Sequence, residues 1–440
     1  MLCYTYSMKF KLNETLLELN NIFKNSNTPL YIVGGFVRDC LLQYAPADID
    51  LASALTNEKL FELLKNTNFK VVESSNKLGT CIITKNNIQF EHTTFRKDFY
   101  LKGGFHTPEK VEFIQEVKED AYRRDFTINS FYYDIENDTI LDYFDGIKDL
   151  KNKIIKTIIA PEKVFESDGL RILRMIRFAL ELGFNIENNT YLVAKEMVFQ
   201  LNDITKDRLY KEFNLILNAQ EKYGCWSDKA FNQFLNLGAL TYIFKSLKNY
   251  ESAKSLKHLY EELFYFFLPN NPYKLQTFLL DFSLYFEKLE NIKASVLLSK
   301  ILQLDTCGIS KREKKDAIDL VKAYEQFKKC SKDETVRKFI QDHKNKISQL
   351  LFLFNNEKDK NEYEKLKHNY DIMLKYNIPF TRSELKIDGK MVEKELNLKN
   401  KKEIGVYLEK ALKFCALEPK NNTKRKLFSY LKNIQQKEKK

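Results

Sequence analysis

Seven scattered cysteines are too few for a disulfide framework in a chain of 440 residues. Their number is odd and no C-x-x-C pair occurs, which excludes a disulfide scaffold and a cysteine zinc site and favours a reducing compartment. No apolar run approaches the roughly 18 residues that a membrane-spanning helix needs. The first ten residues lack the basic start and apolar stretch of a secretory signal. We therefore expect a cytoplasmic protein without membrane spans, with Met8 as an alternative start.

Several common motifs are also absent. The sequence contains neither the P-loop pattern G-x-x-x-x-G-K-[ST] nor G-x-G-x-x-G, which excludes the two most familiar nucleotide-binding loops. None of the five histidines is followed by aspartate, so we expect no attached HD phosphohydrolase. No fixed-period repeat is present, which argues against a solenoid.

Basic residues outnumber acidic ones by 72 to 60, a formal net charge of +12. The excess is uneven, because residues 418–440 hold eight Lys or Arg and two Glu, which is half of the net charge. A positive balance favours a polyanionic partner such as nucleic acid, with a merely solvated surface as the alternative. For residues 418–440 the two corresponding interpretations are a segment that contacts RNA and a frayed, solvated chain end.

The first third of the chain is typical of a mixed α/β domain. Leu12, Leu16, Leu19 and Phe23 follow a helical spacing, and "PLYIVGG" is an apolar strand that ends at glycines. Four short β-rich pieces follow: "KVVESS", "TCIITKN", "IQFEHTTF" and "VEFIQE". Beyond about Pro161 the apolar spacing is helical to the end of the chain. We therefore expect a sheet-containing domain of about 160 residues followed by an all-helical remainder.

Asp48 and Asp50 stand one residue apart in "ADIDLA", where the alternation predicts a strand. Side chains at positions i and i+2 of a strand point to the same face, so both carboxylates would aim at one point. Unpaired, the two charges repel each other, which raises the pKa of one carboxyl, and a divalent cation removes that conflict. Mg²⁺ takes one or two carboxylates together with water and substrate phosphates. For an isolated D-x-D, a solvated turn is the alternative.

The residues before this pair add a phosphate-binding signal. Gly34 and Gly35 allow a ligand to approach the backbone closely, and a helix is predicted to begin near Phe36. The exposed N–H groups at a helix start attract phosphate, and Arg38 adds a cationic fork. A phosphate site and a metal site about ten residues apart indicate a nucleoside triphosphate site.

Six motifs follow one another over roughly the first half of the chain. They are G-G-x-V-R-D with D-x-D (34–50), "TTFRKD" (93–98), "RRDFTINSFYYD" (123–134), "DYFDGIKDL" (142–150), "FESDGLRILRMIRFALELGF" (165–184) and "DRLYKEF" (207–213). In this order they resemble the signature of the class II tRNA nucleotidyltransferases and bacterial poly(A) polymerases, within the polymerase-β-like superfamily. The resemblance implies an α+β head with a mixed sheet and helices, followed by an all-α neck, body and tail. The expected boundaries are 1–160 for the catalytic head, 161–225 for the neck, 226–380 for the body and 381–440 for a tRNA-binding tail.

The resemblance also implies an activity, the addition of nucleotides to an RNA 3′ end with release of pyrophosphate. Asp48 and Asp50 would hold two Mg²⁺ ions, and Glu91 on the "IQFEHTTF" strand is a candidate third carboxylate, with an ordinary exposed strand residue as the alternative. Arg38 and Arg124 would neutralise phosphate charge. Asn129 would bond the ribose or, alternatively, make a turn contact. The alternative interpretation of "RRD" is that Arg123 and Arg124 form a surface pair that binds Asp125.

Base selection is assigned by the same resemblance to Asp168 and Arg171, with Arg174 and Arg177 supplying positioning and phosphate charge. These residues recur every three positions in a predicted helix, so neighbours in the series share a side. Solvated arginines on a helix capped by Ser167 are the alternative. The family motif commonly reads Glu-Asp-x-x-Arg, and Ser167 stands at the Glu position, which we interpret as a capping replacement. "KGGFHTP" (102–108) resembles the loop needed for the switch to A.

The expected function is therefore tRNA CCA addition from CTP and ATP without a nucleic-acid template. An A-adding enzyme or a poly(A) polymerase shares every motif quoted above and is the first alternative; a catalytically inactive RNA-binding protein is the remote one. The expected partner is tRNA, held at its acceptor and T arms by the helical half of the chain through backbone charge. Monomer and homodimer both stay open.

Overall fold

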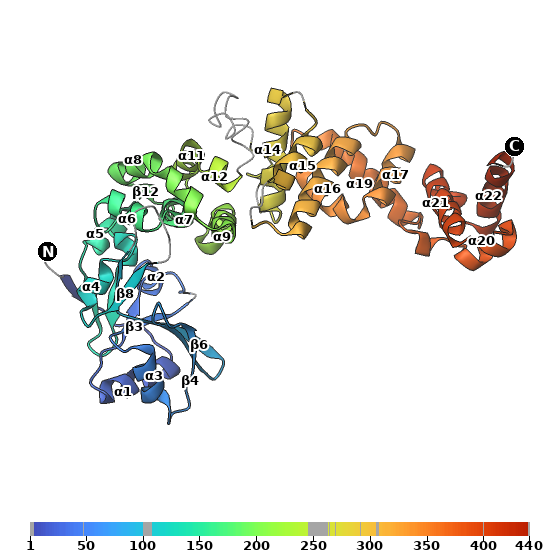
Figure 1. The fold of residues 1–440 in the computed structure, drawn as a ribbon. Coiled ribbons are helices and arrows are strands. Elements are labelled where there is room, and N and C mark those ends of the chain that lie inside the picture. Colours follow the sequence, from blue (N-terminus) through green and yellow to red (C-terminus); the bar gives the residue numbers. More distant parts are fainter. Residues whose placement is uncertain are drawn as a thin grey trace. The chain divides into compact units, whose positions relative to one another are not determined.

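The structure is a computed structural model in which two compact units are distinguished, Met1–Tyr260 with Leu304–Ile309, and Glu261–Gln303 with Ser310–Lys440. It describes residues 4–46, 48–99, 108–244, 263, 265–268, 270–290, 292–304, 308–398 and 400–438. A mixed sheet with helices comes first and a helical part follows, so the predicted fold class is confirmed (Figure 1). The two-residue strand β12 (Asn185–Ile186) is an exception within the helical part that the sequence did not predict. The finer four-part division stays a prediction.

An eight-stranded sheet lies at the centre of the first unit. Its order is β1-β10-β9-β2-β3-β6-β5-β4, and β3 and β6 form its parallel pair. The strands are β1 (Tyr4–Ser7), β2 (Tyr31–Val33), β3 (Asp50–Ser53), β4 (Lys70–Ser75), β5 (Thr80–Lys85), β6 (Ile88–Thr94), β9 (Tyr132–Asp134) and β10 (Thr139–Asp142). The residues before Met8 thus include the strand at one edge. A separate hairpin pairs β7 (Arg96–Phe99) with β8 (Lys110–Phe113).

The core of this unit forms where helices pack on the sheet. Helix α1 (Glu14–Asn25) starts at Asn13, whose side chain accepts the N–H of Leu16, and it buries Leu16, Leu19 and Phe23 completely. These are three of the four apolar positions that the sequence spacing predicted, and the fourth, Leu12, lies before the helix. Helices α2 (Gly35–Leu41) and α3 (Asn57–Leu64) contribute to the same core. At about 25 cal/mol per Å² of apolar surface, such burial is the main stabilising term of the unit.

The register of the sheet fixes the place of the acidic pair. Antiparallel pairing puts Asp50 opposite Val33, the residue before Gly34, and parallel pairing puts it beside Glu91. The glycine turn after β2 and the acidic start of β3 therefore lie next to each other, at the same end of two central strands. The strand predicted over "ADIDLA" begins only at Asp50, so the expectation that Asp48 is a strand residue was wrong.

A buried histidine in β6, the strand that pairs with β3, predicts a pH dependence of stability. His92 in β6 is fully buried, its Nε2 lies 2.8 Å from Ser53 Oγ, and burial lowers its pKa to about 4. In the unfolded chain this histidine binds a proton near pH 6.5, whereas in the folded protein it does so only near pH 4. The free energy of unfolding therefore decreases as the pH falls from 6.5 towards 4. The test is to measure the free energy of unfolding with urea at pH 7 and at pH 4.5. Between these two values the free energy of unfolding of His92→Gln should fall by on the order of 2–3 kcal/mol less than that of the unsubstituted protein. Equal losses would contradict the assignment.

The predominantly helical part begins at the position that the sequence indicated, because α6 begins at Pro161. The remaining elements of the first unit are α4 (Val117–Ala121), η1 (Thr127–Asn129), α5 (Gly146–Lys151), β11 (Ile154–Ile155), α6 (Pro161–Ser167), α7 (Leu170–Leu182), β12 (Asn185–Ile186), α8 (Asn188–Glu196), η2 (Val198–Asp203), α9 (Lys206–Leu217), α10 (Ala219–Tyr223), α11 (Asp228–Asn236) and α12 (Leu240–Ile243). Helix α7 packs against α9, α10 and α11, which makes it the central helix of this group.

The regular elements among the described residues of the second unit are all helices. Its elements are α14 (Lys274–Glu290), α15 (Ala294–Leu304), α16 (Lys311–Phe327), α17 (Asp333–Asp342), η5 (Lys344–Lys346), α18 (Ile347–Phe354), α19 (Lys360–Lys375), η6 (Arg382–Glu384), α20 (Gly389–Leu396), α21 (Lys401–Leu417), η7 (Pro419–Asn421) and α22 (Lys424–Glu438). Leu427 and Leu431 of α22 are buried, so the basic stretch is folded through Glu438 rather than frayed. None of the described helices combines the length and apolar character needed to cross a membrane.

Candidate active site

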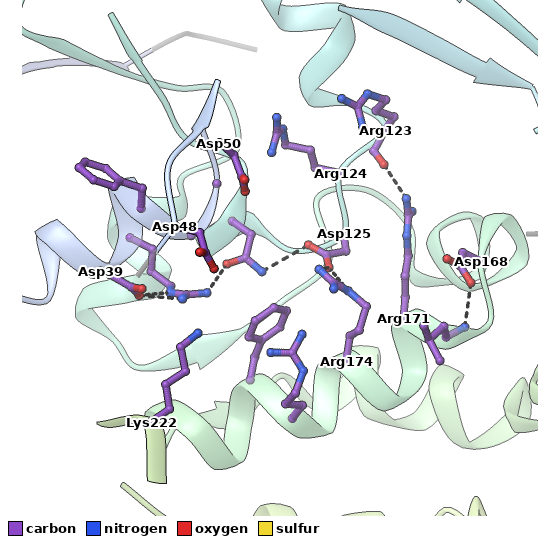
Figure 2. Close-up of a pocket in the computed structure, with 18 of the residues that line it drawn as sticks. Asp39, Asp48, Asp50, Arg123, Arg124, Asp125, Asp168, Arg171, Arg174 and Lys222 are labelled. Atoms are coloured by element: carbon purple, nitrogen blue, oxygen red, sulfur yellow. Dashed lines mark hydrogen bonds and ion pairs between the residues drawn. The ribbon is translucent and has the colours of Figure 1, made fainter. Parts of the chain in front are cut away.

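A cavity of about 560 Å³ opens in the first unit, and Figure 2 shows its lining. Glu91, the candidate third carboxylate, is not among the lining residues. The cavity brings together the other residues that the sequence placed in the metal and nucleotide sites: Gly34, Gly35, Arg38, Asp48, Asp50, Arg124, Asn129, Asp168, Arg171, Arg174 and Arg177. Eight basic and five acidic side chains line it in all. A cavity with this excess of positive charge suits a polyphosphate.

The acidic pair forms part of this lining. Burial raises the pKa of Asp50, the charges of Glu91 and Asp48 raise it further, and Arg124 opposes them. A carboxyl whose pKa is raised by a neighbouring carboxylate fits a divalent cation, which would remove the repulsion. Within the described ranges, no group of three or more His, Cys, Asp or Glu is arranged to hold a metal ion. Asp48 and Asp50 match the one or two carboxylates that Mg²⁺ takes beside substrate phosphates, and metal binding by Asp48, Asp50 and Glu91 stays a prediction.

The turn before α2 requires glycine. Gly34 has φ +69° and ψ −126°, a conformation that side chains disfavour, and a Cβ atom there would lie 3.3 Å from Arg124 Nη1. The turn therefore brings the backbone close to the Arg124 guanidinium. The helix begins at Gly35, one residue before the position that the sequence predicted.

Arg38 is held by protein groups on three sides. Its side chain is only 2% exposed. It donates from Nε and Nη2 to Asp39 Oδ1, from Nη1 to Asn129 Oδ1 at 2.7 Å, and from Nη2 to the Tyr223 hydroxyl at 3.0 Å. Asn129 in turn donates to Asp125 Oδ1 at 3.4 Å. Arg38 and Asn129 therefore stiffen the cavity wall, and their contacts with phosphate and ribose stay predictions.

Arg123 and Arg124 do not pair with Asp125, so that alternative interpretation was wrong. Both arginines form ion pairs with Asp120, which is fully buried. Burial raises the pKa of Asp120, but the two arginines outweigh it and hold the pKa below its usual value. Arg124 also donates from Nε to the Tyr132 hydroxyl at 2.8 Å. Its two terminal nitrogens are left for the cavity, since the ion pair to Asp120 is 3.7 Å long.

The motif that we predict to read the base contains a break that the sequence did not predict. Helix α6 ends at Ser167 and α7 begins at Leu170, so Asp168 lies between two helices. Asp168 accepts the Leu170 N–H at 3.0 Å and pairs with Arg208 at 2.7 Å. A Cβ atom on Gly169 would lie 2.7 Å from the backbone oxygen of Gln200, which explains the small residue at the break.

Ser167 is not the N-cap of a helix, so the capping interpretation was wrong. Its hydroxyl donates to the Val164 carbonyl oxygen and accepts a hydrogen bond from Arg171 Nη1 at 2.9 Å. Nη2 of Arg171 donates to the Arg123 carbonyl oxygen at 2.6 Å. Ser167 thus takes the Glu position of the motif as a partner of Arg171.

The other two arginines of α7 bind buried carboxylates. Arg174 donates from Nε to Asp125 Oδ2 at 2.8 Å, and Arg177 donates to Glu212 and Glu181. Both guanidinium groups also lie over the Phe178 ring, at 5.2 and 4.2 Å from its centroid. These contacts fix the two arginines but also neutralise much of their charge.

Known protein families match both halves of this first unit. The poly A polymerase head domain matches residues 30–156, and the "Probable RNA and SrmB- binding site of polymerase A" matches residues 183–251. Residues 30–156 and 183–251 of the chain thus resemble the poly(A) polymerase head domain and its RNA-binding segment, in line with the family that the motifs indicated.

Curated relatives and a solved structure are similar to this chain. A CCA-adding enzyme of Streptococcus sanguinis is 35% identical over 231 residues, 52% of this chain and 55% of that one, so the match spans little more than half of that relative. A CCA-adding enzyme of Ligilactobacillus salivarius is 29% identical over 392 residues, 86% of each chain. The Bacillus stearothermophilus CCA-adding enzyme in complex with CTP shares the fold, with a TM-score of 0.67, 19% identity and coverage of 96% and 98%.

Five charged residues of the cavity were not assigned to the site from the sequence: Asp39, Arg123, Asp125, Arg208 and Lys222. Asp39 and Asp125 lie inside motifs, next to the arginines on which the prediction concentrated. Arg208 lies in "DRLYKEF", which carried a family signal but no assigned partner. No motif contains Lys222, and only the packing of α10 places it here. The loop predicted at 102–108 lies outside the described residues, apart from Pro108.

Proposed function

We propose that this protein is a CCA-adding tRNA nucleotidyltransferase, which adds C, C and A to the tRNA 3′ end from CTP and ATP. One observation carries the proposal: a single basic cavity is lined both by the acidic pair Asp48 and Asp50 and by the arginine face of α7. The first is suited to transferring a nucleotide and the second to choosing it. The matching family model and the CCA-adding relatives support the same reaction.

Transfer requires the acidic pair and Arg124. Asp48 and Asp50 would hold Mg²⁺, two ions in this proposal, which supplies charge neutralisation for the transferred group and acidifies the RNA 3′-hydroxyl. Arg124 lies beside Gly34 with its terminal nitrogens free for phosphate oxygens. Little covalent work falls to the protein in phosphoryl transfer, so holding the triphosphate in line with the hydroxyl is the main task of these residues.

Selection depends on Asp168 and Arg171. Cytosine and adenine each present a ring-nitrogen acceptor beside an amino donor, which complements an arginine donor and a carboxylate acceptor. Uracil and guanine present the opposite order and would leave buried groups unpaired. Arg208 orients Asp168, and Ser167 with the Arg123 carbonyl orients Arg171. The reading pair is therefore positioned before the nucleotide enters.

The RNA would be held mainly by charge. The matched RNA-binding model at residues 183–251 and the basic helix α22 (Lys424–Glu438) support tRNA as the partner, bound at its acceptor and T arms with residues 381–440 as a binding tail. Backbone contacts of this kind weaken as salt rises. A cytoplasmic location fits such a partner and stays a prediction.

The test is extension of tRNA that lacks its terminal CCA, with labelled CTP and ATP. We expect three added nucleotides and no further growth. A long A tract, on this tRNA or on unrelated RNA, would favour the poly(A) polymerase alternative, and addition of A alone to tRNA ending in CC would favour an A-adding enzyme. Binding of RNA without any extension would identify the inactive RNA-binding protein.

A further inference from the structure

Lys222 at the end of α10 carries a charge that the protein leaves largely free. Its ammonium lies 3.8 Å from Glu181 Oε2 and 5.0 Å from the centroid of the Tyr223 ring. Among the described residues no acceptor takes a hydrogen bond from it, so its three N–H donors are available. The residue lines the cavity, and in Figure 2 its side chain rises towards Asp39, on the opposite side of the view from Asp168.

The next residue fixes where Lys222 stands. The Tyr223 hydroxyl donates to Asp39 Oδ2 at 2.7 Å and accepts from Arg38 Nη2 at 3.0 Å. The Tyr44 ring stacks on the Tyr223 ring with centroids 4.5 Å apart and planes inclined by 21°. Lys222 is therefore anchored against α2, the helix that follows the glycine turn, rather than against the base-reading pair.

The arginines around it are already paired. Arg38 binds Asp39, Arg174 binds Asp125, and Arg177 binds two glutamates. Each of these guanidinium groups has a buried carboxylate partner in direct contact. Lys222 and Arg177 both face Glu181, but the Lys222 ammonium lies beyond hydrogen-bond distance from the Glu181 carboxylate. A phosphate that enters the cavity would thus gain more from the lysine ammonium than from these three arginines.

We propose that Lys222 binds the triphosphate of the incoming nucleotide, as a substrate-binding residue supplied by the neck. The proposal rests on the proposed nucleotide transfer and adds a contact to it. Charge-assisted hydrogen bonds to phosphate are among the strong ones in proteins, and a compact ammonium suits phosphate as a point charge. Because Lys222 lies away from Asp168, its contribution is the same for CTP and ATP.

The test is equilibrium binding of CTP and CMP to the full-length protein without RNA, measured by calorimetry for Lys222→Met and Lys222→Arg. We expect Lys222→Met to weaken CTP binding about tenfold or more and CMP binding less than about twofold, and Lys222→Arg to keep most of the affinity. Lys229→Met is the matched control, since Lys229 is exposed, lies outside the cavity and bonds Asn185. Thermal unfolding of each variant establishes that it is folded, and Lys222→Gln replaces Lys222→Met if the latter is not.

Unchanged CTP binding, or equal weakening of CTP and CMP, would overturn the proposal. Weaker binding of tRNA in a gel-shift assay with unchanged CTP binding would show that the lysine contacts RNA phosphate instead, and would overturn it too. If the unsubstituted protein binds neither CTP nor ATP, the proposed function itself fails, and the inference fails with it.

Discussion

Asp50→Asn and Asp48→Asn will each lower the rate of nucleotide addition by roughly 10³-fold or more. Losing one ligand of a cation that neutralises the transferred group costs several kcal/mol of transition-state stabilisation, and each 1.4 kcal/mol is about tenfold in rate. The measurement is single-turnover extension of tRNA with labelled CTP at saturating Mg²⁺.

The folded state will tolerate the change at Asp50. Burial, with the charges of Glu91 and Asp48, raises the pKa of Asp50, so its ionised form costs stability above that pKa. Metal-free Asp50→Asn should therefore unfold at the same or a slightly higher temperature than the unsubstituted protein. Asp203→Asn is the control, because Asp203 is exposed and outside the cavity, and it should leave the rate unchanged. More than a tenth of the normal rate in either cavity variant would contradict the metal assignment.

Arg171→Ala will lower the preference for CTP and ATP over UTP and GTP by about 10- to 100-fold. The wrong bases are rejected because they leave buried hydrogen-bonding groups unpaired, at a cost of about 1–3 kcal/mol each, and removing the guanidinium removes part of that cost. The measurement is kcat/KM for each of the four nucleotides on tRNA lacking CCA. A fall in all four values by the same factor would show that the base is read elsewhere.

Substitution of Ser167, a hydrogen-bond partner of Arg171, is a milder change to compare with Arg171→Ala. Ser167→Ala removes the hydroxyl that accepts from Arg171 Nη1 but leaves the bond to the Arg123 carbonyl. The arginine then keeps its hydrogen bonds to the Arg123 and Val164 carbonyl oxygens, so we expect a loss of preference in the same direction and several-fold smaller. An unchanged preference would mean that these two carbonyl groups suffice to orient Arg171.

The features of the fold that depend on local pattern could be predicted from the sequence. The apolar spacing of Leu16, Leu19 and Phe23 identified α1, and the change of pattern near Pro161 identified the start of the helical part. The motif residues could also be assigned to one site, because their order matched a family, and the structure places them around one cavity.

The features that depend on distant contacts could not be predicted. Arg38 contacts Tyr223, which is 185 positions away, and nothing in either local sequence indicates that pair. Lys222 reaches the cavity only because α10 packs on α7. The break at Gly169 follows from a close approach of Gln200, whereas the spacing of the arginines alone favours one continuous helix.

The most direct test is the position of the metal in crystals of the full chain grown with CTP and Mn²⁺, located by anomalous scattering. The account predicts a manganese peak in contact with the carboxylates of both Asp48 and Asp50, with the CTP triphosphate on its other side. Bound CTP with no peak at these carboxylates, or with the two side chains turned away from it, would contradict the account.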